Sequence, residues 1–181
     1  MRMRRAASLL SLVLCLMALA ARAAHTQATL VLSDETAKPG DTLWAGVYLK
    51  MEPEWHTYWK NSGDAGMPTT IVWQLPPGVT AGDIHWPIPE KLPPAEVTTY
   101  GYNDETMLLV PLKIGTNVPP GPITLTANLA WLECKDVCVP VKTSVQATLN
   151  VGSETKPSAR AADIEKWQTK LPDPEGFFQA S

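Results

Sequence analysis

Two long alternating segments on either side of a short gap constrain the fold of this chain most strongly. In residues 122–134 and 138–151 the apolar side chains fall mostly on odd-numbered positions. Side chains alternate between the two faces of a strand, so this pattern predicts two β-strands, each with one buried face. If residues 135–137 form a hairpin loop, Trp131 pairs with Val141 and Leu125 pairs with Ala147. In that register the apolar side chains of both strands share one face.

Shorter alternating segments, separated by turns, occupy much of the remaining chain. Residues 43–51 alternate most regularly, and residues 29–33, 69–75 and 107–114 are further candidate strands. Proline and glycine cluster between these segments, as in Pro76-Pro77-Gly78, which favours turns there. Short strands without long amphipathic helices predict an all-β fold, an immunoglobulin-like antiparallel β-sandwich.

The two ends of the chain depart from this pattern. Residues 1–23 combine a basic start, an apolar run and the small-x-small sequence Ala21-Arg22-Ala23, which predicts a secretory signal peptide. Residues 24–152 then form the predicted domain. Residues 153–181 are more polar, with a weak helical stretch around 161–170. They are expected to be a linker or the start of a following region.

Charge and size narrow the functional classes. The signal peptide holds four of the 15 Lys and Arg residues, so 11 remain against 18 Asp and Glu, a net charge near −7. Proteins that bind a nucleic-acid backbone need clustered basic residues, so no nucleic-acid partner is expected. A domain of this size can bury a sufficient core without a disulfide, which weakens a purely structural role for its cysteines.

Cys134 and Cys138 flank the predicted hairpin loop. Their even numbers place both on the polar, solvent-facing side of the hairpin. Pro140 opposite Leu132 requires a non-hydrogen-bonded pair, so the cysteine pair is also of this type, with Cα atoms about 4.5 Å apart. This separation is near the short limit for a disulfide, which predicts a strained bond that opens readily. A single helical turn is a second way to bring the two sulfurs together.

Two other roles for the cysteines remain open at this point. A short hairpin disulfide can be purely structural, although closing so small a loop gives only modest stabilisation. A zinc site would need two further ligands, and the histidines outside the signal peptide are His25, His56 and His85. Copper accepts soft thioether ligands, which could come from Met51, Met67 and Met107.

Four sequence blocks resemble a known family. They are WLECKDVCVP at residues 131–140, EWHTYWKNSGDAGMPTTIVWQLPPGV at 54–79, HWPIPEK at 85–91 and TYGYNDETMLLVPL at 99–112. Together they resemble the N-terminal periplasmic domain of DsbD-type thiol:disulfide interchange proteins, in the branch that includes the copper-sensitivity suppressor B proteins. The resemblance covers residues 28–151. It implies an immunoglobulin-like fold in which Cys134 and Cys138 are the redox pair.

The resemblance also implies a relay of reducing equivalents in the periplasm. A membrane reductase supplies them through its thioredoxin-like domain, and this domain passes them to periplasmic thioredoxin-like proteins and disulfide isomerases. The chain would then be part of a protein-disulfide reductase, with no cofactor of its own and tethered to the inner membrane through a following region. The rival interpretation is a non-redox immunoglobulin-like binding or copper-handling module with a structural disulfide.

Further residues are expected near the cysteine pair. The aromatic cluster at residues 55–59 either packs a strand end or places Tyr58, with Asn61 and Asp64, beside the cysteines to shield the bond and set the thiol pKa. The family covers its cysteine pair with a cap loop that bears an aromatic residue. The resemblance aligns this loop with residues 96–101, which assigns Glu96 and Tyr100 to the cap. No residue is predicted as a metal ligand.

Overall fold

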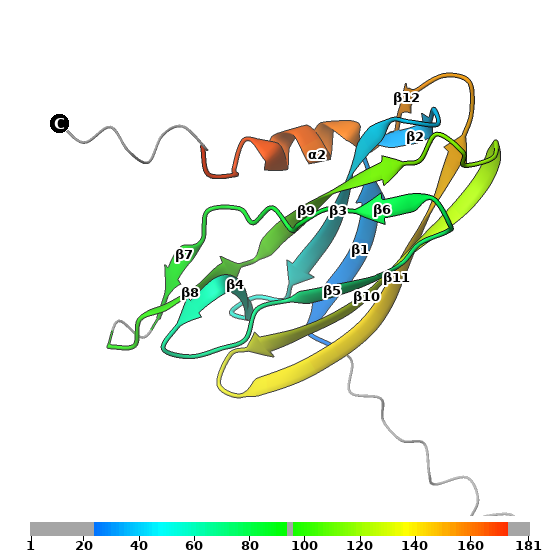
Figure 1. The fold of residues 1–181 in the computed structure, drawn as a ribbon. Helices are drawn as coiled ribbons and strands as arrows, with labels where there is room; N and C mark the ends of the chain where they lie inside the picture. The colour runs from blue at the N-terminus through cyan, green and yellow to red at the C-terminus, as the bar shows by residue number, and fades with distance from the viewer. Residues whose placement is uncertain (1–23, 94–95, 174–181) are drawn as a thin grey trace, which may run out of the picture.

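The computed structural model describes residues 24–93 and 96–173, and the predicted signal peptide lies outside the described residues. Two β-sheets pack face to face, and one helix lies on the outer side of the smaller sheet (Figure 1). The smaller sheet has the strand order β1 (Thr26–Leu32), β3 (Thr42–Met51), β9 (Glu105–Ile114) and β6 (Val79–Ala81). All of its pairings are antiparallel.

The larger sheet is built around one long hairpin. Its strand order is β12 (Lys156–Pro157), β2 (Asp34–Ala37), β11 (Cys138–Val151), β10 (Gly121–Cys134), β4 (His56–Gly63), β8 (Thr99–Asn103) and β7 (Glu90–Leu92), and β5 (Thr70–Gln74) also pairs with β10. Only the short β2–β11 pairing among these described strands is parallel. The predicted antiparallel sandwich is therefore confirmed.

The predicted register of the β10–β11 hairpin is also confirmed. Pairing runs without a shift from Gly121 with Val151 to Cys134 with Cys138. Residues 135–137 form the loop, closed by a bond from the Lys135 amide to the Val137 carbonyl oxygen. A slip by one residue would move every apolar side chain of both strands to the opposite face, so the buried face fixes the register.

The main core lies between the two sheets. Alternate residues of β3, β9 and β10 fill it, with the end of β11. The alternation at residues 43–51 predicts a strand with one buried face, and its odd-numbered side chains are all buried in this core. Leu125, Leu129 and Trp131 supply the β10 layer of this core. Burying apolar surface contributes about 25 cal/mol of stabilising free energy per Å², so the whole core between the sheets stabilises the fold.

A second, smaller core lies on the outer face of the smaller sheet. The helix α2 (Ala161–Gln168) buries Ile164 and Trp167 against Val31, Met107 and Leu109. Gly46 permits the close approach, because a Cβ there would lie 2.5 Å from the Met107 sulfur and 2.9 Å from Ile164 Cδ1. The predicted helical stretch is present. The helix packs on the smaller sheet, a contact that the prediction of a linker or the start of a following region did not include.

Strands β4, β7 and β8, together called the cover, have no strand signal in the sequence. These strands extend the larger sheet beyond the tip of the β10–β11 hairpin (Figure 1). His56 in β4 pairs with both Cys134 and Asn103, so the cover is attached to the hairpin at the cysteine itself. Because of this attachment, side chains of β4 and β7 lie against the disulfide, namely Tyr58 and Leu92.

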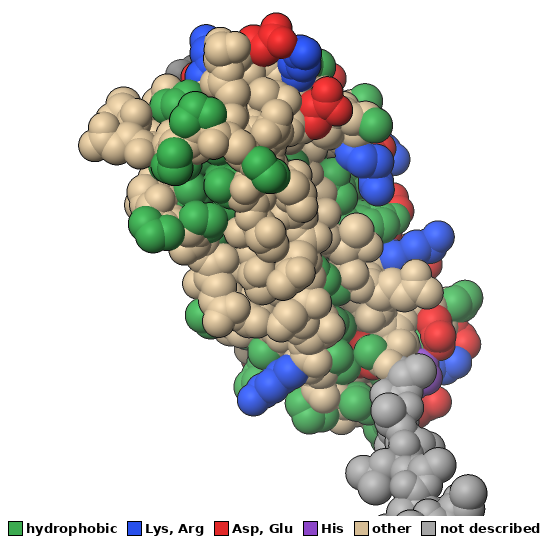
Figure 2. All heavy atoms as spheres, turned by 90° about the vertical axis from the view of Figure 1, so that its right-hand side faces the viewer, with side chains coloured by type: hydrophobic (Ala, Val, Ile, Leu, Met, Phe, Trp, Pro, Cys, Tyr) green, Lys and Arg blue, Asp and Glu red, His purple; other side chains and the backbone are tan. Residues whose placement is uncertain are grey.

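The outer surface carries charges of both signs. On the face shown in Figure 2, acidic and basic side chains are intermingled along one flank, and the middle of the face is mostly backbone and uncharged side chains. No helix in the described part of the chain is long and apolar enough to cross a bilayer.

Candidate functional site

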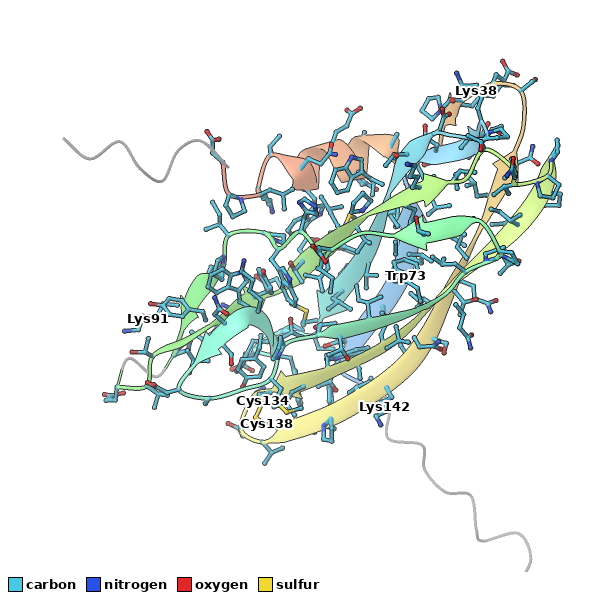
Figure 3. All side chains as sticks on the ribbon, in the orientation of Figure 1. Lys38, Trp73, Lys91, Cys134, Cys138 and Lys142 are labelled. Atoms are coloured by element: carbon cyan, nitrogen blue, oxygen red, sulfur yellow. A yellow bond between two sulfur atoms is a disulfide. The ribbon has the colours of Figure 1, made fainter. Side chains whose placement is uncertain are left out.

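Cys134 and Cys138 form a disulfide at the tip of the β10–β11 hairpin (Figure 3). Their Cα atoms are 4.2 Å apart, close to the separation predicted from the hairpin register. The two cysteines end one strand and begin the next, so the loop between them contains only Lys135, Asp136 and Val137. The prediction of a hairpin, rather than a helical turn, is confirmed at this position.

The two cysteines differ in their exposure. Cys138 is exposed, whereas Cys134 is only 2% exposed and packs with Tyr58, Leu92 and Leu132. The prediction that both sulfurs lie near the surface is wrong for Cys134. Its side chain leaves the sandwich core on the predicted outer face, but the cover lies over that face. The disulfide therefore joins one exposed residue to one buried residue.

Tyr58 contacts the accessible cysteine directly. Its hydroxyl lies 3.7 Å from the Sγ of Cys138, and Nε2 of His56 lies 3.3 Å from the same hydroxyl oxygen. The ring of Tyr58 is packed against Gly66, where a Cβ would lie 2.2 Å from two ring carbons. The predicted position of Tyr58 beside the cysteines agrees with this geometry.

Burial shifts the pKa of both His56 and Tyr58. Desolvation lowers the pKa of His56, because the charged imidazolium loses water contacts. Desolvation raises the pKa of Tyr58, because the charged phenolate is disfavoured in the same way. Near pH 7 the pair is therefore a neutral imidazole beside a neutral phenol.

A buried carboxylate lies behind the hairpin tip. Glu133 is fully buried and accepts hydrogen bonds from the backbone amide of His25 at 2.8 Å and from Nε1 of Trp131 at 3.3 Å. Buried carboxylates need such partners, since an unpaired one is costly. Glu133 thereby fixes the start of β1 to the end of β10, on the face opposite to the cysteines.

The other residues assigned to the site lie elsewhere around the cover. The carboxylate of Asp64 accepts a hydrogen bond from the backbone amide of Thr98 at 3.0 Å, which joins the end of β4 to the start of β8. Tyr100 makes an edge-to-face contact with the ring of Trp59. Asn61 and Glu96 are exposed. Tyr58 is thus the one residue of this predicted set whose recorded contact reaches a cysteine sulfur, and a shielding role for the others stays a prediction.

Sequence reasoning missed two contributors to the site. Leu92 is 1% exposed and covers Cys134, but a single leucine in the short strand Glu90–Leu92 gives no periodic signal. From the sequence, His56 stands out only as one of the three histidines that a zinc site could use. The spacing of His56 and Tyr58 places them on one face of a strand, and this signal could have linked them.

The site offers thiol chemistry rather than an evident metal centre. Among the residues that the structure describes, no group of three His, Cys, Asp or Glu side chains is placed to hold a metal ion. A disulfide can undergo exchange, in which a thiolate attacks one sulfur along the S–S axis. Cys138 is the exposed residue of this pair, and Cys134 is buried under the cover.

Comparisons with solved structures give the fold. The N-terminal periplasmic domain of ScsB from Proteus mirabilis matches with a TM-score of 0.60 and 21% identity, over 87% of this chain and 59% of that chain. The chain thus spans about three fifths of that structure. The reduced form of the Neisseria meningitidis DsbD N-terminal domain matches with a TM-score of 0.37 and 19% identity, over 71% of this chain and 90% of that one.

The immunoglobulin-like β-sandwich predicted from the sequence is confirmed by the likeness in fold to the ScsB domain. No curated protein matches the chain in sequence. The family model for the N-terminal domain of the thiol:disulfide interchange protein DsbD matches residues 27–150, which include both cysteines and the cover. The chain therefore belongs to the family of DsbD N-terminal domains, thiol–disulfide exchange domains, and carries a cysteine pair within the matched region.

Proposed function

We propose that this domain passes reducing equivalents between thiol-redox proteins through Cys134 and Cys138. The observation that carries the proposal is the asymmetry of the disulfide, with Cys138 exposed and Cys134 covered by Tyr58 and Leu92. A partner can reach only one sulfur, so the order of the two exchange steps is set by access. A bond whose only task was to hold the hairpin together would need no such asymmetry.

Delivery of electrons takes two exchange steps. In the reduced domain, the Cys138 thiolate attacks a sulfur of the partner's disulfide. A mixed disulfide forms, and the partner's other sulfur leaves as a thiolate that takes up a proton. The Cys134 thiolate then attacks Sγ of Cys138, and the partner's second sulfur leaves. Two electrons and two protons have moved to the partner, and the Cys134–Cys138 disulfide has formed.

The proposed place of this exchange is the periplasm. The predicted signal peptide supports export, and the family resemblance supplies the partners. We propose a thioredoxin-like domain of a membrane reductase as the electron donor, and periplasmic thioredoxin-like proteins and disulfide isomerases as acceptors. The direction of flow and a tether to the inner membrane through a region after residue 181 are parts of the same proposal.

Trapping of the mixed disulfide tests the proposed order of steps. Cys134→Ser leaves Cys138 as the free thiol and removes the resolving sulfur. Incubation with a purified disulfide isomerase whose CxxC pair is oxidised should then give a covalent adduct on a non-reducing gel. Cys138→Ser is the matched control and should give little adduct, because Cys134 is covered. An adduct that forms through Cys134 alone would contradict the proposal.

A further inference from the structure

The contact between Tyr58 and Cys138 has a defined donor. The phenol oxygen lies 3.7 Å from Sγ, within the range of a hydrogen bond to sulfur. A disulfide sulfur carries no proton, so the phenol must donate and the sulfur must accept. Sulfur in a disulfide is a weak acceptor, whereas a thiolate at the same place would be a charged one. Hydrogen bonds to charged groups are roughly twice as strong as bonds between neutral groups.

His56 completes the arrangement from the other side of the phenol. The hydroxyl has a single proton, so when that proton is donated to the sulfur the oxygen accepts from Nε2 of His56, 3.3 Å away. This arrangement requires the Nε2–H tautomer of a neutral imidazole. The two rings meet edge to face, with centroids 5.3 Å apart. A hydrogen bond donated to the phenol oxygen makes the phenol hydroxyl a stronger donor to the sulfur.

The fold holds this pair of rings in place. Tyr58 is 4% exposed, and its ring lies against the backbone of Gly66, next to an isolated bridge between Tyr58 and Pro68. The backbone of His56 is paired with Cys134 on one side and Asn103 on the other. The donor is therefore aimed at the Cys138 sulfur before any reaction begins, so ordering it costs little further entropy.

We propose that Tyr58 stabilises the thiolate of Cys138 by hydrogen bonding and that His56 is a positioning residue that orients the Tyr58 hydroxyl. This inference rests on the proposed function, in which Cys138 is the attacking sulfur. It adds a catalytic residue, Tyr58, that contacts the reacting atom. The neutral state of His56 near pH 7 follows from its burial and agrees with this role.

Most other charged groups near the hairpin tip have their own partners. Glu133 lies on the opposite face with its own donors. Lys135 in the loop is paired with Glu54, and its neighbour Asp136 is exposed. On the cover, Glu90 accepts a bond from Asn103 at 3.1 Å. None of these described charged groups forms a hydrogen bond or ion pair with Sγ of Cys138, whereas the Tyr58 hydroxyl contacts it.

A titration of the single thiol tests this proposal. In a Cys134→Ser background, the thiol pKa of Cys138 is measured by thiolate absorbance and by the pH profile of iodoacetamide alkylation. Tyr58→Phe should raise this pKa by about one unit. Alkylation near pH 7 should slow about threefold, since the higher intrinsic nucleophilicity of the more basic thiolate offsets part of the loss. His56→Leu should produce a smaller shift in the same direction.

Two further variants separate orientation from general packing. His56→Gln retains an amide donor near the position of Nε2 and should restore most of the parental thiol pKa. Tyr48→Phe removes a hydroxyl that donates a hydrogen bond to Glu105 within the smaller sheet. This variant should leave the thiol pKa of Cys138 unchanged. The proposal is overturned if Tyr58→Phe, folded as judged by its unfolding curve, keeps the parental thiol pKa. If Tyr58→Phe does not fold, an unshifted pKa in His56→Leu overturns it.

The readout also separates this inference from the proposed function. The thiol pKa of one cysteine is measured without a partner and without the disulfide. A shifted pKa in Tyr58→Phe, together with no adduct in the trapping experiment, would support the hydrogen bond and refute the exchange role. An adduct with an unshifted pKa would do the reverse.

Discussion

Cys134 and Cys138 belong to one disulfide, yet side chains from other strands give each a different environment. Leu92 and Tyr58 exclude water from Cys134, and the Tyr58 hydroxyl lies beside Cys138. Each of these contacts comes from the cover, which lies far from the cysteines in sequence. At the scale of single residues, the character of the site therefore depends on how well the Tyr58 ring is held.

Gly66 holds that ring, and its replacement should disturb the site. Gly66 has a φ of +92°, and a Cβ would overlap the Tyr58 ring. Gly121 is a matched control, with a φ of +130° but open space around it. Gly66→Ala should lower the free energy of unfolding by about 2 kcal/mol more than Gly121→Ala, because only the first adds an overlap to the backbone strain. Urea unfolding checks this, and equal losses would contradict it.

His56 should make stability depend on pH. Its pKa is lowered in the folded state, so below about pH 6.5 the unfolded chain takes up this proton first. The free energy of unfolding should therefore decrease as the pH falls from 7 towards 5, and it should decrease less in His56→Gln. Urea unfolding at both pH values measures the difference. Identical pH slopes for the two proteins would show that the histidine contributes nothing.

At the scale of elements, the hairpin and the cover have different origins. The register of β10 and β11 could be predicted to the residue, because a slip by one position would reverse the faces of about a dozen alternating side chains. The sequence could not reveal β4 or β7 in the same way. Residues 56–63 mix aromatic and polar side chains, and β7 has three residues. Their strand conformation is imposed by pairing with neighbours, which local propensity does not record.

The shelter of Cys134 was unpredictable for the same reason. The alternation correctly placed both cysteines on the outer face of the hairpin, but it could not show that another part of the sheet covers one of them. The docking of α2 has a comparable cause. Val31, Met107 and Leu109 make a second apolar face on the smaller sheet, and the short helical pattern at residues 161–168 reveals a partner only when that face is known.

The cover should control access to the disulfide. Leu92→Ala removes a buried contact with Cys134 and should accelerate reduction of the disulfide by dithiothreitol under native conditions. Leu125→Ala is the matched control, because it creates a cavity in the main core away from the cover. Both should lose about 2–4 kcal/mol of stability. If the two variants are reduced equally fast at equal stability, the cover does not shield the bond.

Helix α2 should contribute to the stability of the sandwich rather than only connect it to other regions. Trp167 is buried against the smaller sheet, so Trp167→Ala should lower the free energy of unfolding by about 3–5 kcal/mol. The neighbouring Gln168 is not part of that core, and Gln168→Ala should change stability by less than about 0.5 kcal/mol. Chemical denaturation compares the two. A small loss in Trp167→Ala would mean that the helix is not firmly docked.

At the scale of the whole molecule, a stable sandwich supports a site at one end. Neither cysteine belongs to the main core or to the α2 core, so we expect both cores to persist when the disulfide opens. Cys134 belongs instead to a separate small core with Tyr58 and Leu92. This separation is what an exchange domain requires, because its fold must persist in both redox states.

The reduction potential of the Cys134–Cys138 disulfide tests the central claim most directly. It is measured by equilibrating the domain with glutathione or dithiothreitol buffers and quantifying the free thiols. A domain that exchanges electrons with partners should have a potential above about −300 mV, within the range of thioredoxin-like carriers. A potential below about −300 mV, which is typical of structural disulfides, would contradict the account.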